Sequence, residues 1–425
     1  MNTVMLDSFV KTLTGPCMVR QGGSVLACCS GGIDSMVLLD LLVLAAGPLC
    51  LRLGVVHADH GIRGEESRKD ALFVSESCKK LGLPCHVYRL GMSPDEPNLE
   101  EQARLLRYDK ILACMNEQGY LSAATGHTMD DQAETLVYRL IRGSGIRGLA
   151  GMEYRSANGV IRPMLTFTRE QIEGYAAKRG IAYSEDGTNL DTTLARNLIR
   201  REIVPLMKRI NSSAVKAISR LAGIAREEGE FIERQVSALE DSSRVIDWGI
   251  VRAYRHADLE NAPPAVLKRL MIRIVSTMID EPRGIDSLQV EDIAGVVEGR
   301  KAAHTVKRKV LVSRDEDCVV FSTSGAGPFY DITIQKPGTY MIEPLHQQVR
   351  IDFDKGMGLF HLRSHMPGDR FQGRRVVRLL ADKEVTKSLR PFWPVLVSGG
   401  EVVSVVGMRD SRDGLVVQTV FPCRG

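Results

Sequence analysis

The fold is decided by residues 25–42, which read VLACCSGGIDSMVLLDLL. The apolar run 25–29 predicts a short buried strand, and the run 36–42 predicts a helix packed along one side. The glycine-rich turn between them forms an anion site, because the first N–H groups of a helix lack intrahelical partners and carry the positive end of its dipole. The two adjacent glycines let the backbone approach a phosphate closely.

The turn consists of Ser30, Gly31, Gly32, Ile33, Asp34 and Ser35. Its two serines can add hydroxyl hydrogen bonds to an anion. Asp34 is the unusual residue, since a carboxylate beside phosphates is repulsive unless a divalent cation lies between them. We therefore expect a Mg²⁺-bound polyphosphate here, with Asp34 as the metal ligand. The spacing and the lysine of a Walker A loop are absent from the turn.

The composition is that of an ordinary soluble globular protein. The chain has 425 residues, of which 44% are hydrophobic and 25% charged, which is enough for two to four domains. The net charge of +4 is mild and excludes little. No apolar run reaches the length of a membrane span and the N-terminus lacks a signal-peptide layout, so we expect a cytoplasmic protein with no membrane partner. The nine cysteines include no C-x-x-C pair, so we expect reduced core thiols rather than a zinc or iron–sulfur site.

Strands alternating with helices predict an α/β fold with a doubly wound parallel sheet. The predicted strands are 25–29, 51–57, 85–90 and 121–125, with a helix over 99–118 before the last of them. Ligands of such sheets bind beyond the carboxyl ends of the strands. Ser30, His57 and His127 each follow a predicted strand, so one site would collect them.

A second motif, residues 126–135, reads GHTMDDQAET. On a helix that begins near Met129, Asp130 and Asp131 lie in the first turn and Glu134 shares their face. In isolation, such carboxylates are as well explained by a favourable interaction with the helix dipole. Beside a histidine and a phosphate turn, three carboxylates instead favour a metal site or a pocket for a cationic substrate.

Three segments are rich in arginine. Residues 139–149 predict a mobile basic loop, and residues 196–205 predict a helix with a cationic face. Near the C-terminus, the loop 367–375 places three arginines around Phe371, which suits phosphate contact plus base stacking. For the last two segments, a solvated surface is the alternative explanation.

The second half of the chain changes in character. Residues 214–239 predict a long linking helix, residues 247–260 a connector, and later segments a small helical unit with a hairpin. A glycine-rich gap at 324–327 precedes alternating strands. We therefore expect a small mostly helical domain and a small β-rich C-terminal domain after the α/β domain. The predicted domain bounds are 1–212, 213–326 and 327–425.

The turn at 30–35 resembles the PP-loop, S-G-G-x-D-S, of ATP pyrophosphatases, which cleave ATP to AMP and pyrophosphate. Over roughly the first half, the chain is more specifically similar to tRNA(Ile)-lysidine synthases. The motifs that carry this resemblance occur in the family's order: SGGIDS, HADHGIRGEES, EEQARLLRY, HTMDDQAET, RGSGIRGL and EDGTN followed by ARNLIRREIVP. The resemblance implies a PP-loop catalytic domain followed by appended tRNA-binding domains.

The resemblance also implies a reaction. ATP, L-lysine and the wobble cytidine of an isoleucine tRNA with a CAU anticodon would give lysidine, AMP and pyrophosphate, so that the tRNA reads AUA. The oxygen at ring carbon 2 is a poor leaving group and is first adenylated. The ε-amine of lysine then displaces AMP.

The resemblance assigns roles to particular residues. The turn 30–35 would hold the β- and γ-phosphates, and Arg104 would stabilise charge on the α-phosphate. Asp131 and Glu134 would bind the lysine ammonium and accept its proton. His127 and Asp130 would support the nucleotide or metal, and His57 and Gly126 would lie near the nucleotide. The arginines expected to bind tRNA are Arg142, Arg147, Arg196, Arg200, Arg201, Arg370, Arg374 and Arg375.

Two other interpretations compete with this one. Another PP-loop RNA-modifying enzyme is the first, but thiolating members need cysteine pairs and amidotransferase members need an ammonia source. A non-catalytic tRNA-binding protein that keeps the fold is the second, but the retained carboxylates argue against it. Turnover of ATP to pyrophosphate separates an enzyme from the non-catalytic protein, which would show none. The sequence also allows a homodimer.

Overall fold

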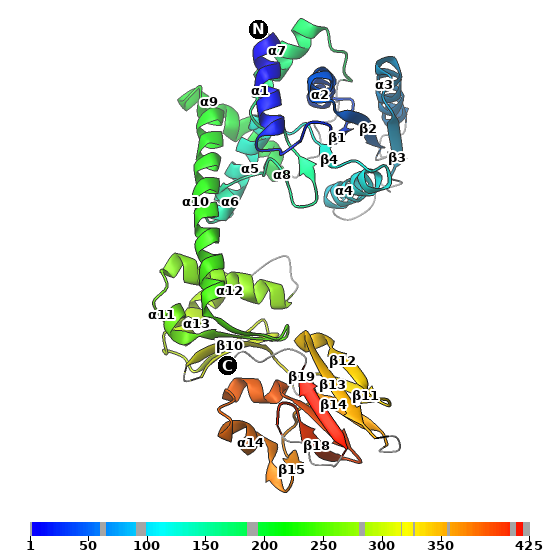
Figure 1. Cartoon of the computed structure of the whole chain (residues 1–425). Helices are drawn as coiled ribbons and strands as arrows, with labels where there is room; N and C mark the ends of the chain where they lie inside the picture. The colour runs from blue at the N-terminus through cyan, green and yellow to red at the C-terminus, as the bar shows by residue number, and fades with distance from the viewer. Residues whose placement is uncertain are drawn as a thin grey trace. The chain divides into compact units, whose positions relative to one another are not determined.

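The computed structural model describes residues 2–59, 65–90, 99–184, 194–279, 285–315, 317–325, 328–354, 358–408 and 414–419. The chain forms two compact units, Met1–Gly229 and Glu230–Gly425, and Figure 1 labels most of their helices and many of their strands. The three domain bounds expected from the sequence stay a prediction. Among the described residues, no helix has both the length and the apolar character needed to cross a membrane.

The first unit is built on a five-stranded sheet in which every neighbouring pair is parallel. Its strands are β1 (Ser24–Cys28), β2 (Arg52–Asp59), β3 (Cys85–Arg89), β4 (Ser122–Ala124) and β5 (Val160–Ile161). The spatial order is β3-β2-β1-β4-β5. The chain winds outward from β1 in one direction and then from β4 in the other, which confirms the doubly wound sheet. The reversal between β1 and β4 creates the crevice where such folds bind ligands.

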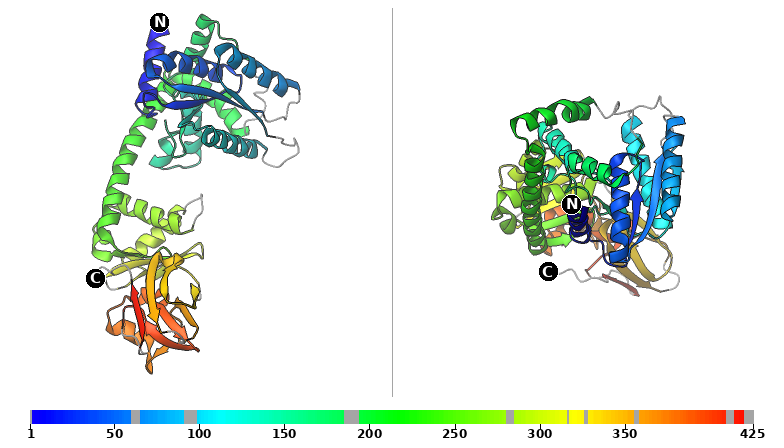
Figure 2. Two further views of the ribbon diagram at one scale, coloured as in Figure 1. Left: turned by 45° about the vertical axis from the view of Figure 1, so that its right-hand side comes forward. Right: turned by 90° about the horizontal axis from the view of Figure 1, so that it is seen from above.

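Helices cover both faces of this sheet (Figure 2). They are α1 (Asn2–Thr14), α2 (Ile33–Leu49), α3 (Glu65–Leu81), α4 (Leu99–Glu117) and α7 (Arg169–Arg179). Val25 and Ala27 of β1 pack in one core with α1, α2, α3 and α7. Leu26, which lies between them, packs in the other core with α4. The alternation of side chains along a strand thus explains why the apolar run is continuous.

A smaller cluster attaches a group of helices to the acidic motif. It joins Ala133 and Val137 to Ile199, Val204 and Val215. The helices of this region are α5 (Met129–Ile141), α6 (Ile146–Leu149), α8 (Leu194–Leu198), the π-helix η1 (Ile199–Ile203), α9 (Val204–Ile210) and α10 (Ala214–Ser243). The cluster fixes η1 against α5, so residues near 200 face the carboxylates of α5 although they are distant in sequence.

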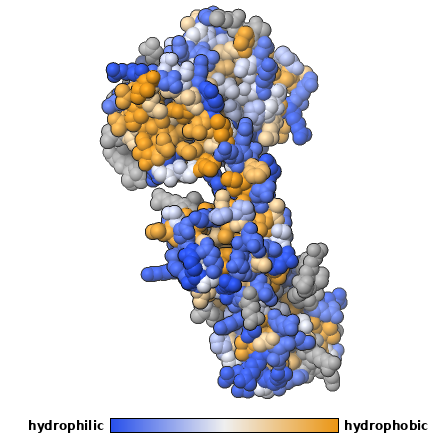
Figure 3. All heavy atoms as spheres, turned by 90° about the vertical axis from the view of Figure 1, so that its left-hand side faces the viewer, coloured by the Kyte–Doolittle hydropathy of each residue, from blue (hydrophilic) through white to orange (hydrophobic). Residues whose placement is uncertain are grey.

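The surface of the first unit carries many exposed apolar side chains, and Figure 3 shows a broad apolar area on one of its faces. The most exposed of them include Val4, Ile141 and Ile210. Apolar areas of this kind mark interaction surfaces. The homodimer that the sequence allows stays a possibility that the structure does not test.

The second unit begins with a five-stranded antiparallel sheet of order β6-β7-β10-β9-β8, packed against helices. Its elements are β6 (Arg244–Asp247), β7 (Val251–Arg255), α11 (His256–Glu260), α12 (Pro264–Ile279), α13 (Ser287–Val297), β8 (Ala303–Val306), β9 (Val310–Arg314) and β10 (Cys318–Thr323). The connector expected over 247–260 is therefore wrong. The sequence did not predict strand β7 because Arg252 gives the segment a polar character. In the structure Arg252 pairs with Asp247 at 3.1 Å, and Val251 and Ala253 are buried.

The C-terminal part is rich in β-structure, as expected. It contains a four-stranded sheet (β11-β14-β17-β18), a three-stranded sheet (β12-β13-β19) and the hairpin β15-β16. Their bounds are β11 (Asp331–Ile334), β12 (Gly338–Ile342), β13 (Gln347–Phe353), β14 (Phe360–Ser364), β15 (Arg370–Phe371), β16 (Arg374–Arg375), α14 (Val376–Asp382), β17 (Pro394–Ser398), β18 (Glu401–Val405) and β19 (Leu415–Thr419). Val251 and Val320 of the preceding sheet share a core with Phe360 and Leu396, so both parts of the second unit form one body.

Candidate active site

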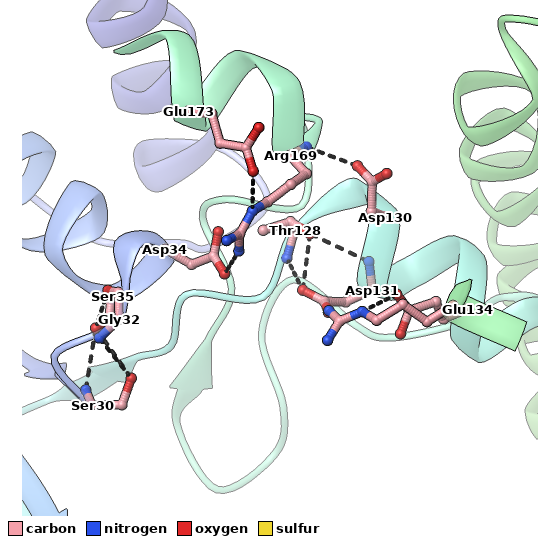
Figure 4. Close-up of polar contacts among 11 residues, drawn as sticks. Ser30, Gly32, Asp34, Ser35, Thr128, Asp130, Asp131, Glu134, Arg169 and Glu173 are labelled. Atoms are coloured by element: carbon pink, nitrogen blue, oxygen red, sulfur yellow. Dashed lines mark hydrogen bonds and ion pairs between the residues drawn. The ribbon is translucent and has the colours of Figure 1, made fainter. Parts of the chain in front are cut away.

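The glycine-rich turn leaves the start of α2 open to an anion. Gly32 is the N-cap residue and makes no side-chain cap, and Gly31 has φ +97°, a conformation that favours glycine. The Ser35 hydroxyl closes the turn, because it accepts the Ser30 N–H at 3.2 Å and donates to the Gly32 carbonyl at 2.8 Å (Figure 4). The turn is thus held by its own hydrogen bonds, and among the described residues no side chain caps the N-terminus of α2 at Gly32.

Asp34 lies in the first turn of α2 and is only partly satisfied. Its Oδ2 accepts a hydrogen bond from Arg169, while its Oδ1 is buried and has no hydrogen-bond partner among the residues that the structure describes. Burial raises the pKa of Asp34 to about 6, and the nearby charge of Arg169 opposes this rise. A buried carboxylate oxygen with no partner is costly unless a ligand satisfies it. Beside a phosphate turn, a hard divalent cation is the ligand that fits.

The donor set around Asp34 suits magnesium that is bound together with phosphates. The described residues contain no group of three or more His, Cys, Asp or Glu side chains that could hold a metal by themselves. Magnesium is usually held by one or two carboxylates plus substrate phosphates, not by an all-protein cage. The free Oδ1 of Asp34 fits that pattern, with the remaining ligands coming from a polyphosphate and water.

Arg169 is a site residue that the sequence analysis missed. It begins α7 and contacts Asp34, 135 residues earlier. Its backbone N–H donates to Asp130 Oδ2 at 2.8 Å, and its Nε donates to Glu173 Oε1 at 2.9 Å. Arg169 therefore links the phosphate turn to the acidic helix, as Figure 4 shows. The pattern Thr168-x-x-Gln171 could have located the helix start as a capping box, but nothing in the sequence points to Asp34.

The acidic helix α5 begins with a capping box. Asp131 Oδ2 accepts the Thr128 N–H at 2.8 Å, which fixes the helix start. The other oxygen of Asp131 lies 3.2 Å from Arg200 Nη2, and Glu134 Oε1 accepts from Arg200 Nε at 2.8 Å. One guanidinium therefore bridges the two carboxylates that the resemblance assigns to lysine. Arg200 was expected to contact tRNA, and nothing in the sequence predicted that it pairs with Asp131 and Glu134.

Asp130 uses both carboxylate oxygens within the chain. Oδ2 accepts the Arg169 N–H, and Oδ1 lies 2.9 Å from Lys208 Nζ. These contacts tie α7 and α9 to the start of α5. Its expected support of a nucleotide or metal stays a prediction, and its observed contacts position the other site residues.

Burial shifts two further pKa values in the site. The pKa of Glu134 is raised, chiefly by burial, although Arg200 opposes the rise. The pKa of His127 is lowered to about 4 by burial and by the charges of Arg162 and Arg104, although Asp131 opposes this. His127 is therefore neutral at pH 7, and its Nδ1 lies 2.8 Å from Thr125 Oγ1.

The structure places the other predicted site residues as follows. Gly126 lies against the phosphate turn, because a Cβ there would lie 3.1 Å from the Asp34 carbonyl carbon. His57 is buried, and its Nδ1 lies 2.8 Å from the Cys29 carbonyl oxygen, just before the turn. Arg104 is exposed on α4 with its Cζ 5.9 Å from the centroid of the Tyr108 ring.

The basic loop after α5 is held in place rather than left without contacts. Arg139 Nη1 donates to the carbonyls of Gly148 and Gly151, both at 2.9 Å. Arg142 and Arg147 are exposed on this loop, and Arg142 donates to the Tyr138 hydroxyl at 2.8 Å. Of the remaining predicted tRNA contacts in this unit, Arg196 is half-buried and Arg201 exposed.

The C-terminal basic loop forms the hairpin β15-β16. Arg370, Arg374 and Arg375 are all exposed, as RNA contact requires. Phe371 is only 6% exposed and packs in a core with Val376, so the expected base stacking by Phe371 is wrong. The physical reason is the alternation of side chains along β15, which turns Phe371 inward as Arg370 points outward.

A PP-loop domain model matches residues 4–207 of the chain. The tRNA(Ile)-lysidine synthase of Solibacter usitatus is 32% identical over 418 residues, which cover 91% of this chain and 93% of that protein. The enzyme of the same name from Clostridioides difficile is 26% identical and covers 95% and 94% of the two chains. That of Thermus thermophilus is 35% identical and covers 89% and 68%. The chain belongs to the tRNA(Ile)-lysidine synthase family.

Proposed function

We propose that this protein joins L-lysine to carbon 2 of the wobble cytidine in the CAU anticodon of an isoleucine tRNA. The reaction consumes ATP and releases AMP and pyrophosphate. One observation carries the proposal, namely that Arg169 connects two parts of the site. Its side chain contacts Asp34 of the phosphate turn, whose other oxygen is buried and has no partner among the described residues. Its backbone N–H donates to Asp130, next to the carboxylate pair Asp131 and Glu134 that binds the Arg200 guanidinium. The names of the relatives support the same reaction.

At the ATP end, the open N-terminus of α2 and the Ser30 hydroxyl bind phosphate oxygens. Magnesium, when bound at Asp34, neutralises phosphate charge. Arg169 adds a further positive charge beside the turn, and Arg104 is the second candidate for stabilising the α-phosphate. The cytosine oxygen attacks the α-phosphorus, and the bond from that phosphorus to the pyrophosphate oxygen breaks.

At the lysine end, Asp131 and Glu134 bind the ammonium group. The ε-ammonium must lose a proton before its nitrogen can attack, and Glu134 is the acceptor whose raised pKa favours that transfer. The nitrogen then bonds to ring carbon 2, the bond from that carbon to its adenylated oxygen breaks, and AMP leaves with this oxygen. His127 is neutral and supports the site without supplying charge.

The tRNA would contact exposed arginines on both units. In the first unit these are Arg142, Arg147 and Arg201, with the half-buried Arg196 beside them. In the second unit they are Arg370, Arg374 and Arg375. Guanidinium groups form hydrogen bonds with phosphate oxygens, and the contribution of each such contact to tRNA affinity would fall as the salt concentration rises.

The experiment that tests the proposal is incorporation of labelled lysine into tRNA transcripts, with and without ATP. We expect ATP-dependent label in the isoleucine tRNA with a CAU anticodon and little in the methionine tRNA with the same anticodon. Pyrophosphate release with another RNA, but no lysine label, would indicate a different PP-loop enzyme. RNA binding without either activity would indicate a non-catalytic protein.

A further inference from the structure

We propose that Arg200 is a resident cation that the substrate lysine must displace from Asp131 and Glu134. The inference rests on the proposed binding of lysine by this carboxylate pair. It adds a competition between a group of the protein and the substrate for one site, so that the lysine pocket is never an empty anionic site.

The contacts of Arg200 are those expected of a bound cationic ligand. Its Nε lies 2.8 Å from Glu134 Oε1 and its Nη2 lies 3.2 Å from Asp131 Oδ1. The Glu134 side chain is only 14% exposed and that of Asp131 25%, whereas the Arg200 side chain is 40% exposed. The carboxylates are thus set into the protein, and the guanidinium reaches them from the more exposed side. A group placed in this way can leave without disturbing the core.

The backbone that carries Arg200 would stay in place during such an exchange. Ile199 and Val204 are buried in the cluster that joins η1 to α5. Arg200 itself lies in the five-residue π-helix η1, and π-helical turns occur frequently at functional sites. Displacement therefore requires only rotation of a long, flexible side chain.

The carboxylate pair needs a cation at all times. Burial raises the pKa of Glu134, and the charge of Asp131 raises it further. Leaving two partly buried carboxylates together without a cation is strongly unfavourable. Exchange of a guanidinium for an ammonium keeps the charge balanced throughout. A neutral or acidic amino acid cannot make this exchange, so the resident cation adds selectivity for a cationic substrate.

Calorimetric titration of L-lysine into the full chain without RNA tests the proposal. Removal of the competitor in Arg200→Gln should tighten lysine binding on the order of tenfold, because the fraction of open pocket rises. Arg209→Gln is the matched control, since Arg209 is an exposed arginine on the adjacent α9 and makes no hydrogen bond or ion pair with the described residues. We expect that control to change lysine affinity less than about twofold. Arg200→Lys, which keeps the charge but not the two-nitrogen contact, should lie between wild type and Arg200→Gln.

A second measurement does not depend on how the variants fold. In wild-type protein with ¹⁵N-labelled arginine, the Nε–H signal of Arg200 should move toward that of a free guanidinium as lysine saturates the site. A signal that keeps its position at saturating lysine would overturn the proposal.

Failure of this inference and failure of the proposed function give different results. If Glu134→Gln abolishes lysine binding but Arg200→Gln weakens or does not change it, the pocket is correct and Arg200 is not a competitor. If lysine binds equally well to wild type and Glu134→Gln, the pocket assignment is itself wrong, and the inference is overturned with it.

Discussion

Asp34 of the first unit and Asp369 of the second each lie beside an arginine at a loop that we propose binds a ligand, but their carboxylate oxygens have different hydrogen-bond partners. Burial acts to raise the pKa of Asp369, yet hydrogen bonds from Arg363 at 2.8 and 2.9 Å and from the Met366 N–H at 2.8 Å outweigh it and lower that pKa. Asp34 has one oxygen without a partner, and its pKa is raised to about 6. Both oxygens of Asp369 are thus bonded within the fold, whereas one oxygen of Asp34 has no partner among the described residues and is the atom to which we assign a metal ligand role.

The largest expected effect follows from removing the half-satisfied carboxylate. Asp34→Ala should reduce ATP-dependent AMP release to less than about a tenth of normal, a loss of more than roughly 1.4 kcal/mol in the barrier, while tRNA affinity stays nearly intact. Release of AMP and binding of labelled tRNA would both be measured. AMP release above that level would show that Asp34 is not the metal ligand, so that Asp34 and Asp369 would not differ in role as proposed.

The second prediction concerns Glu134, the carboxylate that pairs with Arg200. Glu134→Gln keeps the size of the side chain but removes the charge that would bind an ammonium. We expect the KM for lysine to rise far more than the KM for ATP, measured by steady-state lysine incorporation. Equal effects on both substrates would place Glu134 outside the lysine pocket.

The third prediction tests the fully satisfied carboxylate. Asp369→Ala leaves the Arg363 side chain, which is 13% exposed, without its carboxylate partner, and we expect a loss of about 3 kcal/mol in the unfolding free energy of the second unit. The only two tryptophans, Trp248 and Trp393, have ring centroids 5.6 Å apart in this unit, so fluorescence in denaturant reports it. Asp34→Ala is the control and should leave this transition unchanged. An unchanged midpoint in Asp369→Ala would show that the network does not stabilise the fold.

The smallest expected effect is a difference in pH dependence. Because the folded-state pKa of Asp34 is raised to about 6, the folded protein binds a proton that the unfolded chain releases, and stability falls as pH rises through that value. Asp34→Asn removes this penalty, so it should stabilise the first unit by about 1 kcal/mol more at pH 7.5 than at pH 5. Asp369 has the opposite sign, since its contribution is lost as pH falls through its lowered pKa. Calorimetric unfolding of wild type, Asp34→Asn and Asp369→Ala at pH 5 and pH 7.5 measures the difference in unfolding free energy.

The sequence predicted those features that depend on neighbouring residues. The turn at 30–35, the parallel sheet and the carboxylates at the start of α5 are local patterns: an apolar run, two glycines and polar residues at helical spacing. Arg370 and Arg375 were expected to contact tRNA; the structure shows both of them exposed, and the contact itself stays a prediction.

Contacts between distant segments were not predictable in the same way. Arg169 meets Asp34 because α7 packs on α2, and Arg200 meets Glu134 because η1 packs on α5. No local pattern encodes which cation reaches which carboxylate. Phe371 was misjudged because two residues are too few to show the alternation that turns it inward.

The most direct test of the free Asp34 oxygen is calorimetric titration of ATP with Mg²⁺ or with EDTA, in wild type and in Asp34→Asn. If that oxygen is a metal ligand, wild-type affinity for ATP should fall more than about tenfold without Mg²⁺, and Asp34→Asn should lose most of this dependence. The same dependence on Mg²⁺ in both proteins would contradict the assignment of Asp34 as the residue that holds the metal.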